Sequence, residues 1–141
     1  MYMIEINNTT EYKINKKLIR KTAEKFLLSR KLGEKEVSLA FIDDKEMRRL
    51  NRNYRKKDKT TDVLSFAGEG DDHDFFGEIV ISPAQIKKQA KENGNTFQGE
   101  LIFILVHGLL HLAGYNDETE KDRIKMIKLG ERFIKELRFK I

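Results

Sequence analysis

The chain contains no cysteine and only a single proline. Without cysteine, a disulfide partner and a thiolate metal site are both excluded, so any metal ion must be bound by histidine and carboxylate side chains. The longest apolar run, residues 101–112, is too short to span a bilayer and is interrupted by His107, Gly108 and His111. The first eight residues alternate in polarity and lack the pattern of a secretory signal. We therefore expect no membrane partner and a cytoplasmic location.

The length of 141 residues is enough for one domain with one hydrophobic core. No repeat, low-complexity tract or linker divides the chain, so a single domain over residues 1–141 is predicted. Lys and Arg number 28 against 23 Asp and Glu, which gives a net charge of +5. An excess of this size helps a protein to approach a phosphate polymer, and it is equally typical of a generically basic soluble protein.

Hydrophobic periodicity predicts an α+β fold with a mixed four-stranded sheet packed with about five helices. Ser82 and Pro83 are typical of a helix start, and Gly114 is placed to end a helix. The acidic loop 68–74, which contains His73, is interpreted as a solvated surface loop. The predicted strands are residues 2–7, 36–42, 61–66 and 76–82, and the predicted helices are residues 15–30, 44–54, 83–93, 96–113 and 118–139, the last with an apolar stripe of Ile124, Ile127, Ile134 and Leu137.

A candidate metal site lies on the central apolar helix and in the turn after it. His107 and His111 are four residues apart, so a helix places both imidazoles on one face, within reach of one zinc ion. Gly114 can reverse the chain and return Asp117 over that face as a third ligand. Two histidines in an otherwise apolar helix are costly to bury without a partner. Three protein ligands with an open fourth position are typical of catalytic zinc.

The same motif resembles the H-E-x-x-H signature of zinc proteases, with one decisive difference. Gly108 stands where the protease requires its glutamate general base. A zinc-dependent protease-like hydrolase is therefore an alternative only if another residue supplies the base. Glu78, inside an apolar run, is a weak candidate for such a base.

A second candidate feature is the basic segment 45–59. It holds eight Lys and Arg against two acids, a net charge of +6 that exceeds the charge of the whole chain. A solvated helix face is one interpretation, and a phosphate-binding surface is the other. Arg55 is the leading phosphate ligand because a guanidinium binds phosphate oxygens bidentately. The further candidates for RNA binding are Arg48, Arg52, Tyr54, Lys56 and Lys57.

Several blocks of the sequence, in this order, resemble the bacterial YbeY family. They are Leu50-Asn51 with Tyr54-Arg55, residues 57–66, residues 77–82 and residues 107–117, and the resemblance extends over about residues 36–135. It implies a single-strand-specific, zinc-dependent endoribonuclease that acts in 3′-end maturation of small-subunit rRNA and in ribosome quality control. The expected partners are therefore rRNA or ribosomal particles, together with a small-subunit ribosomal protein.

The resemblance also assigns roles to individual residues. It implies that His107, His111 and the residue at position 117 bind zinc and that Arg55 is functionally important. The family usually has histidine at the last of these positions, whereas this chain has Asp117. A carboxylate makes the site one charge more negative and harder, which favours other divalent ions relatively more. A non-enzymatic ribosome-assembly factor with a structural metal stays open as a further alternative, and the general base is unassigned.

Overall fold

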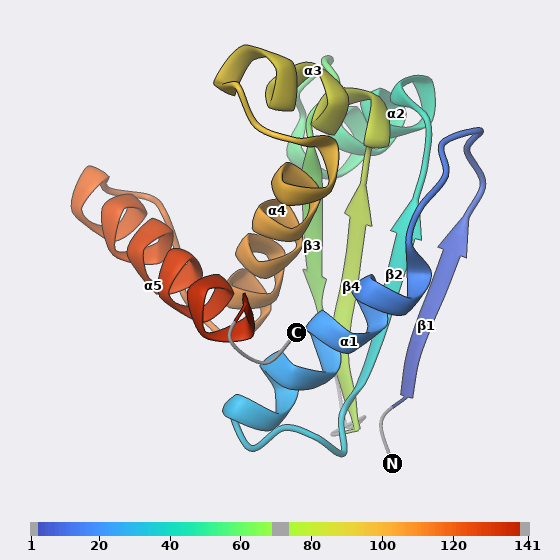
Figure 1. The fold of residues 1–141 in the computed structure, drawn as a ribbon. Helices are drawn as coiled ribbons and strands as arrows, with labels where there is room; N and C mark the ends of the chain where they lie inside the picture. Colours follow the sequence, from blue (N-terminus) through green and yellow to red (C-terminus); the bar gives the residue numbers. More distant parts are fainter. Residues whose placement is uncertain (1–2, 69–73, 139–141) are drawn as a thin grey trace.

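Four strands and five helices make up the part of the chain that this computed structural model describes, residues 3–68 and 74–138 (Figure 1). Tyr2, His73 and Phe139, which the sequence placed in a strand, a loop and a helix, lie outside the described residues. The elements are β1 (Met3–Asn8), α1 (Lys16–Ser29), β2 (Glu36–Phe41), α2 (Asp44–Arg55), β3 (Val63–Ala67), β4 (Phe75–Ile81), α3 (Pro83–Asn93), α4 (Phe97–Leu112) and α5 (Glu120–Arg138).

The sheet is mixed, as the sequence predicted, with the strand order β1-β2-β4-β3. Strands β1, β2 and β4 run parallel, and β3 pairs antiparallel with β4 at the edge of the sheet. Among the described residues, no strand pairs with the other side of β3. That free side becomes a wall of the functional cavity described below.

Helices cover the two faces of the sheet unequally. α1 and α4 pack on one face, where Val37, Leu39 and Phe41 of β2 are fully buried, and α2 packs on the other face through Met47 (Figure 1). Helix α4 lies at the centre, in contact with α1, α3, α5, β3 and β4. It is apolar nearly all round because it is enclosed nearly all round. The side chains it carries are therefore held by a rigid support.

Polar caps fix where the helices begin. Asn15, Asp43, Ser82 and Thr96 each precede a helix, and each side chain accepts a hydrogen bond from a backbone N–H in the first turn. This is the usual way to satisfy the free N–H groups of a helix start. The Ser82-Pro83 start predicted from the sequence is confirmed, with Pro83 as the first residue of α3.

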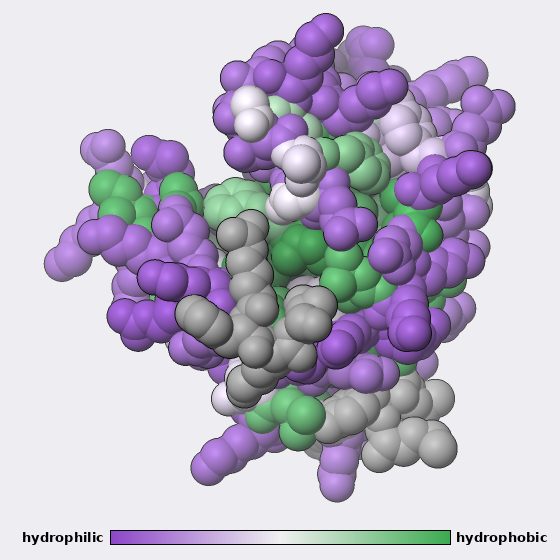
Figure 2. Space-filling view, in the orientation of Figure 1, coloured by the Kyte–Doolittle hydropathy of each residue, from purple (hydrophilic) through white to green (hydrophobic). Residues whose placement is uncertain are grey.

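Two sequence expectations need correction. β3 begins at Val63, so Thr61 and Asp62 precede the strand. In α5 the predicted apolar stripe holds at Leu137, which is buried, and at Ile127 and Ile134, which are partly buried, but Ile124 is 42% exposed. The buried face also includes Met126 and Gly130. Figure 2 shows hydrophobic atoms on the surface at the outer end of α5. Large aliphatic residues alone therefore included one exposed position, Ile124, and missed the glycine on the buried face.

Among the described residues, no helix combines the length and the apolar character that a bilayer span requires.

Candidate metal centre and active-site cavity

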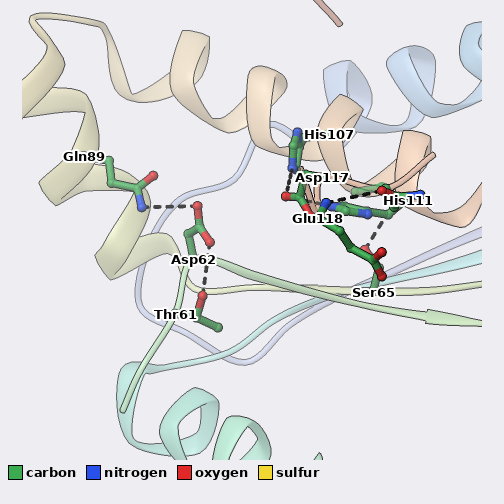
Figure 3. Close-up of polar contacts among 10 residues, drawn as sticks. Thr61, Asp62, Ser65, Gln89, His107, His111, Asp117 and Glu118 are labelled. Atoms are coloured by element: carbon green, nitrogen blue, oxygen red, sulfur yellow. Dashed lines mark hydrogen bonds and ion pairs between the residues drawn. The ribbon is translucent and has the colours of Figure 1, made fainter. Parts of the chain in front are cut away.

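The structure brings the three predicted metal ligands together (Figure 3). His107 and His111 lie one turn apart on α4, and Nε2 of each imidazole is 3.6 Å from Oδ2 of Asp117. The potential ligand atoms of all three residues lie within 4.8 Å of one another. His111 packs edge-on against His107, with ring centroids 4.8 Å apart. The group is thus one turn of a buried helix closed by a carboxylate from the next segment.

The spacing of these atoms fits a metal ion better than a direct hydrogen bond. An N–H···O hydrogen bond is about 2.7–3.2 Å long, shorter than the 3.6 Å seen here. Two ligand atoms at about 2.0–2.1 Å from a tetrahedral zinc ion are roughly 3.4 Å apart. Two imidazole nitrogens and one carboxylate oxygen are also a donor set that zinc accepts. The residues present therefore fit one divalent ion with an open coordination position.

The turn after α4 explains how Asp117 returns to the helix. Gly114 has a φ of +102°, a conformation that favours glycine, and its N–H bonds to the carbonyl of His111. The next residue, Tyr115, donates its N–H to the carbonyl of Leu110. Its ring is held by Arg30, the C-cap residue of α1, whose Nη1 donates to the Tyr115 hydroxyl at 2.9 Å. The chain reversal predicted from Gly114 is therefore anchored to a second helix.

Gly108 faces the sheet. A Cβ on this residue would lie 3.0 Å from Cγ2 of Ile79 in β4 and 3.3 Å from the hydroxyl of Ser65 in β3. The Ser65 hydroxyl also donates to the Gly108 carbonyl. A glutamate at this position would point into packed β-sheet, because only the absence of a side chain lets α4 approach so closely. The position that carries the base in zinc proteases cannot carry one here.

Burial sets the protonation of the first ligand. It lowers the pKa of His107 below the ordinary histidine value, and the nearby His111 lowers it further. The charges of Asp117 and Asp62 oppose this shift without reversing it. His107 is therefore neutral at pH 7, which is the form that binds a metal ion.

His107, His111 and Asp117, referred to below as the ligand group, line a cavity of about 760 Å³. Its walls come from three places: the end of α2, the segment that leads into and along β3, and the facing sides of α4 and α5. Phe103 of α4 stacks near His107 inside it. The lining residues are Tyr54, Arg55, Thr61, Asp62, Val63, Leu64, Ser65, Phe66, Ala67, Phe103, Ile104, His107, His111, Leu112, Asp117, Arg123 and Ile127.

The predicted basic segment divides into two parts. Tyr54 and Arg55 line the cavity, and the exposed Tyr54 ring rests edge-on against Phe66. Arg48 and Arg52 instead pair with Asp58, whose pKa is lowered by the hydrogen bond from Arg48.

Lys56 and Lys57 are exposed and do not line this cavity. The left-handed conformation of Lys56, with φ +59°, turns the chain back and brings Asp58 beneath α2. Of the RNA-binding candidates, only Tyr54 shares the cavity with Arg55 and the ligand group. An RNA-binding role for the others stays a prediction.

Two charged residues of the cavity, Asp62 and Arg123, were given no role in the sequence analysis. Among the described residues, Asp62 is the one carboxylate besides Asp117 that lines the cavity, and Gln89 and Thr61 donate to its two oxygens (Figure 3). Arg123, on α5, is the other charged residue that lines the cavity without a role assigned from the sequence. Asp62 lies inside the block of residues 57–66 that resembles the family, whereas no local sequence pattern marks Arg123. Glu78 bonds to Ser38 on the sheet and does not line the cavity.

Comparison with known proteins agrees with this arrangement. The sequence model of the family described as "Endoribonuclease YbeY" matches residues 4–138. The chain belongs to the YbeY family. Its YbeY relatives include the protein named Endoribonuclease YbeY from Petrotoga mobilis, 40% identical over 94% of this chain and 92% of the relative. The protein of the same name from Endomicrobium trichonymphae is 39% identical, with 88% and 86% covered.

Not every relative has the same extent. The YbeY endoribonuclease of Myxococcus xanthus is 42% identical over 85% of this chain, but the match spans only 42% of that protein. Among solved structures, the solution structure of TM1509 from Thermotoga maritima superposes with a TM-score of 0.63 at 31% identity, covering 98% of this chain and 93% of that one. The YbeY assignment therefore rests on nearly the full described fold.

Proposed function

We propose that this YbeY protein is an endoribonuclease specific for single-stranded RNA, acting in 3′-end maturation of small-subunit rRNA and in ribosome quality control. In this proposal residues 1–141 form one metallo-endoribonuclease domain, with one zinc ion held by His107, His111 and Asp117. The observation that carries it is that the ligand group and Arg55 line the same cavity. The family and the names of its members support RNA as the substrate.

The chemistry follows from the residues in the cavity. When bound, a divalent ion lowers the pKa of a water molecule and polarises a phosphoryl oxygen. Arg55 binds an oxygen of the same phosphate and stabilises the negative charge that develops on it. Asp62 accepts the proton of the attacking water as the new P–O bond forms, and the leaving sugar oxygen takes a proton from solvent as its bond to phosphorus breaks. Thr61 and Gln89 orient the Asp62 carboxylate for this role.

Zinc is proposed because the donor set has two imidazoles and an open position. The carboxylate of Asp117 makes the site harder than a site with three histidines, so manganese and magnesium are the competitors to test. We also propose a cytoplasmic location, since rRNA processing takes place there, and a small-subunit ribosomal protein as a partner that delivers the enzyme to its substrate.

The proposal is tested first by metal content. Protein purified under metal-replete conditions is expected to carry one divalent ion per chain by elemental analysis. His107→Ala and Asp117→Ala are each expected to lose it. Wild-type protein without stoichiometric metal would contradict the ligand assignment.

Activity is tested on labelled single-stranded and duplex RNA. Wild-type protein is expected to cleave the single strand, and His107→Ala and Arg55→Gln, purified in parallel, are expected to be inactive. Arg132→Gln is the matched control, because Arg132 is an exposed arginine outside the cavity. Cleavage that persists in His107→Ala points to a contaminating nuclease. If chelation unfolds the protein while His107→Ala and Arg55→Gln leave rRNA processing intact, the metal is structural and the protein is an assembly factor.

A further inference from the structure

The cavity has a basic residue on the wall formed by α5, in addition to Arg55 of the predicted basic segment. Arg123 lies near the start of α5 and is exposed, and it lines the same cavity as Arg55 and the ligand group. Within the described parts of the chain, no acidic side chain forms an ion pair with it, whereas Arg48, Arg49 and Arg52 all have acidic partners. Its guanidinium is therefore available to a ligand.

The two cavity arginines come from different sides of the ligand group. Helix α4 contacts both β3 and α5 (Figure 1). His107 and His111 of α4 line one cavity together with residues of β3 and α5. Arg55 ends α2, next to the segment that leads into β3, while Arg123 is on α5. A polymer lying across the ligand group therefore meets one guanidinium on each side.

The charges of the cavity favour a polyanion once the ion is bound. The ionised side chains that line it are Arg55 and Arg123 against Asp62 and Asp117, so they cancel. A divalent ion then leaves a net charge of about +2. The acidic residues in the first turn of α5, Glu120 and Asp122, do not line the cavity. One phosphodiester at the ligand group carries a single negative charge and offsets half of this excess, and a neighbouring phosphodiester would offset the other half.

We propose that Arg123 binds the phosphate next to the one that is cleaved, so that two successive phosphates of a single strand are held at once. This inference rests on the proposed function. Arg123 is a positioning residue: it fixes the register of the strand, while Arg55 acts on the reacting phosphate. The exposed ring of Tyr54, which lines the same cavity, offers a stacking surface for an unpaired base along this path.

The first test compares variants on a single-stranded oligoribonucleotide that the wild-type protein cleaves at one bond. Arg123→Gln is expected to raise KM about tenfold, as for the loss of one charge-assisted hydrogen bond, with kcat changed less than twofold. Arg123→Lys is expected to recover part of the loss. The plot of log binding constant against log salt should become shallower by about 0.7 for Arg123→Gln. Arg132→Gln, nine residues away on the opposite face of α5, is the control for charge alone.

The second test locates the phosphate. Neutral methylphosphonate linkages are placed one at a time beside the cleaved bond. A neutral linkage at one of the two neighbouring positions, and not at the other, is expected to weaken binding to the wild-type protein. The same linkage is expected not to weaken binding to Arg123→Gln any further. Equal KM values for Arg123→Gln and Arg132→Gln, or additive losses at both positions, would overturn the inference. If the wild-type protein itself neither binds nor cleaves RNA, the proposed function has failed instead.

Discussion

Two buried glycines on helices give a sharp test of the close approach between α4 and the sheet. In an exposed helix interior, replacement of glycine by alanine stabilises by about 1 kcal/mol through helix propensity. Gly130 of α5 has room for this change, since its added Cβ would lie 3.7 Å from Val106 and 3.8 Å from Leu110. At Gly108 the added Cβ would lie 3.0 Å from Ile79. Overpacking of that kind costs about 1–3 kcal/mol.

The two variants are therefore expected to differ in sign. Gly130→Ala should raise the free energy of unfolding by about 1 kcal/mol, which for 141 residues corresponds to about 3 °C in Tm. Gly108→Ala should lower it by roughly 0–2 kcal/mol once propensity and overpacking are combined. Thermal and denaturant unfolding of the metal-free proteins measure both. Ile79→Ala, which removes the two nearest atoms, should cost less in the Gly108→Ala background than alone. The reasoning is refuted if Gly108→Ala stabilises as much as Gly130→Ala.

Three further perturbations probe the site. Lowering the pH through about 6.5 should reduce the stability of the metal-free protein, because unfolded His107 takes up a proton there and folded His107 only at a lower pH; chemical unfolding at several pH values measures this. Arg30→Gln should weaken metal binding by up to about tenfold in chelator competition, since it releases Tyr115 beside the ligand turn. Asp62→Asn should lower kcat about 10²–10⁴-fold in single-turnover cleavage, as for the loss of a general base.

Each of these predictions has a control. The pH slope should be shallower in His107→Gln, and an unchanged slope would show that another group causes it. Tyr115→Phe removes the hydroxyl and keeps the ring, so its metal affinity should lie between those of the wild-type protein and Arg30→Gln. Asp62→Asn should still bind metal and RNA normally. A loss of RNA binding in that variant would assign Asp62 to substrate contact instead of proton transfer.

The sequence predicted the helix boundaries and the ligand group because both depend on local patterns. Asp43, Ser82 and Thr96 precede apolar-periodic segments, and a capping side chain acts within three residues of its own position. His107 and His111 share a face through helix geometry alone, and a glycine turn of a few residues fixes where Asp117 can go. The predicted α+β architecture is confirmed for the same reason: each strand and helix has its own periodicity.

Features that depend on distant segments could not be predicted in this way. The position of β3 at the sheet edge, beside β4, decides that Asp62 enters the cavity, and no spacing in the sequence encodes that order. The pairing of Arg48 with Asp58 depends on a left-handed residue between them. Arg123 reaches the cavity only because α5 packs along α4. Net charge along the sequence therefore drew attention to the segment that includes Arg55, which lines the cavity, and gave no sign of Arg123, which lines it too.

Asp117 lies neither on α4 nor on α5 but in the short connection between them, and it is 42% exposed. Its two fellow ligands are fixed on a buried helix, so an ion at this site ties the connection, and the helix that follows it, to the core. An ion that draws Asp117 towards the two histidines therefore also acts on the start of α5. If Arg123 on that helix binds RNA as proposed above, metal binding and RNA binding are thermodynamically linked, and each is expected to change the affinity of the other by the same factor.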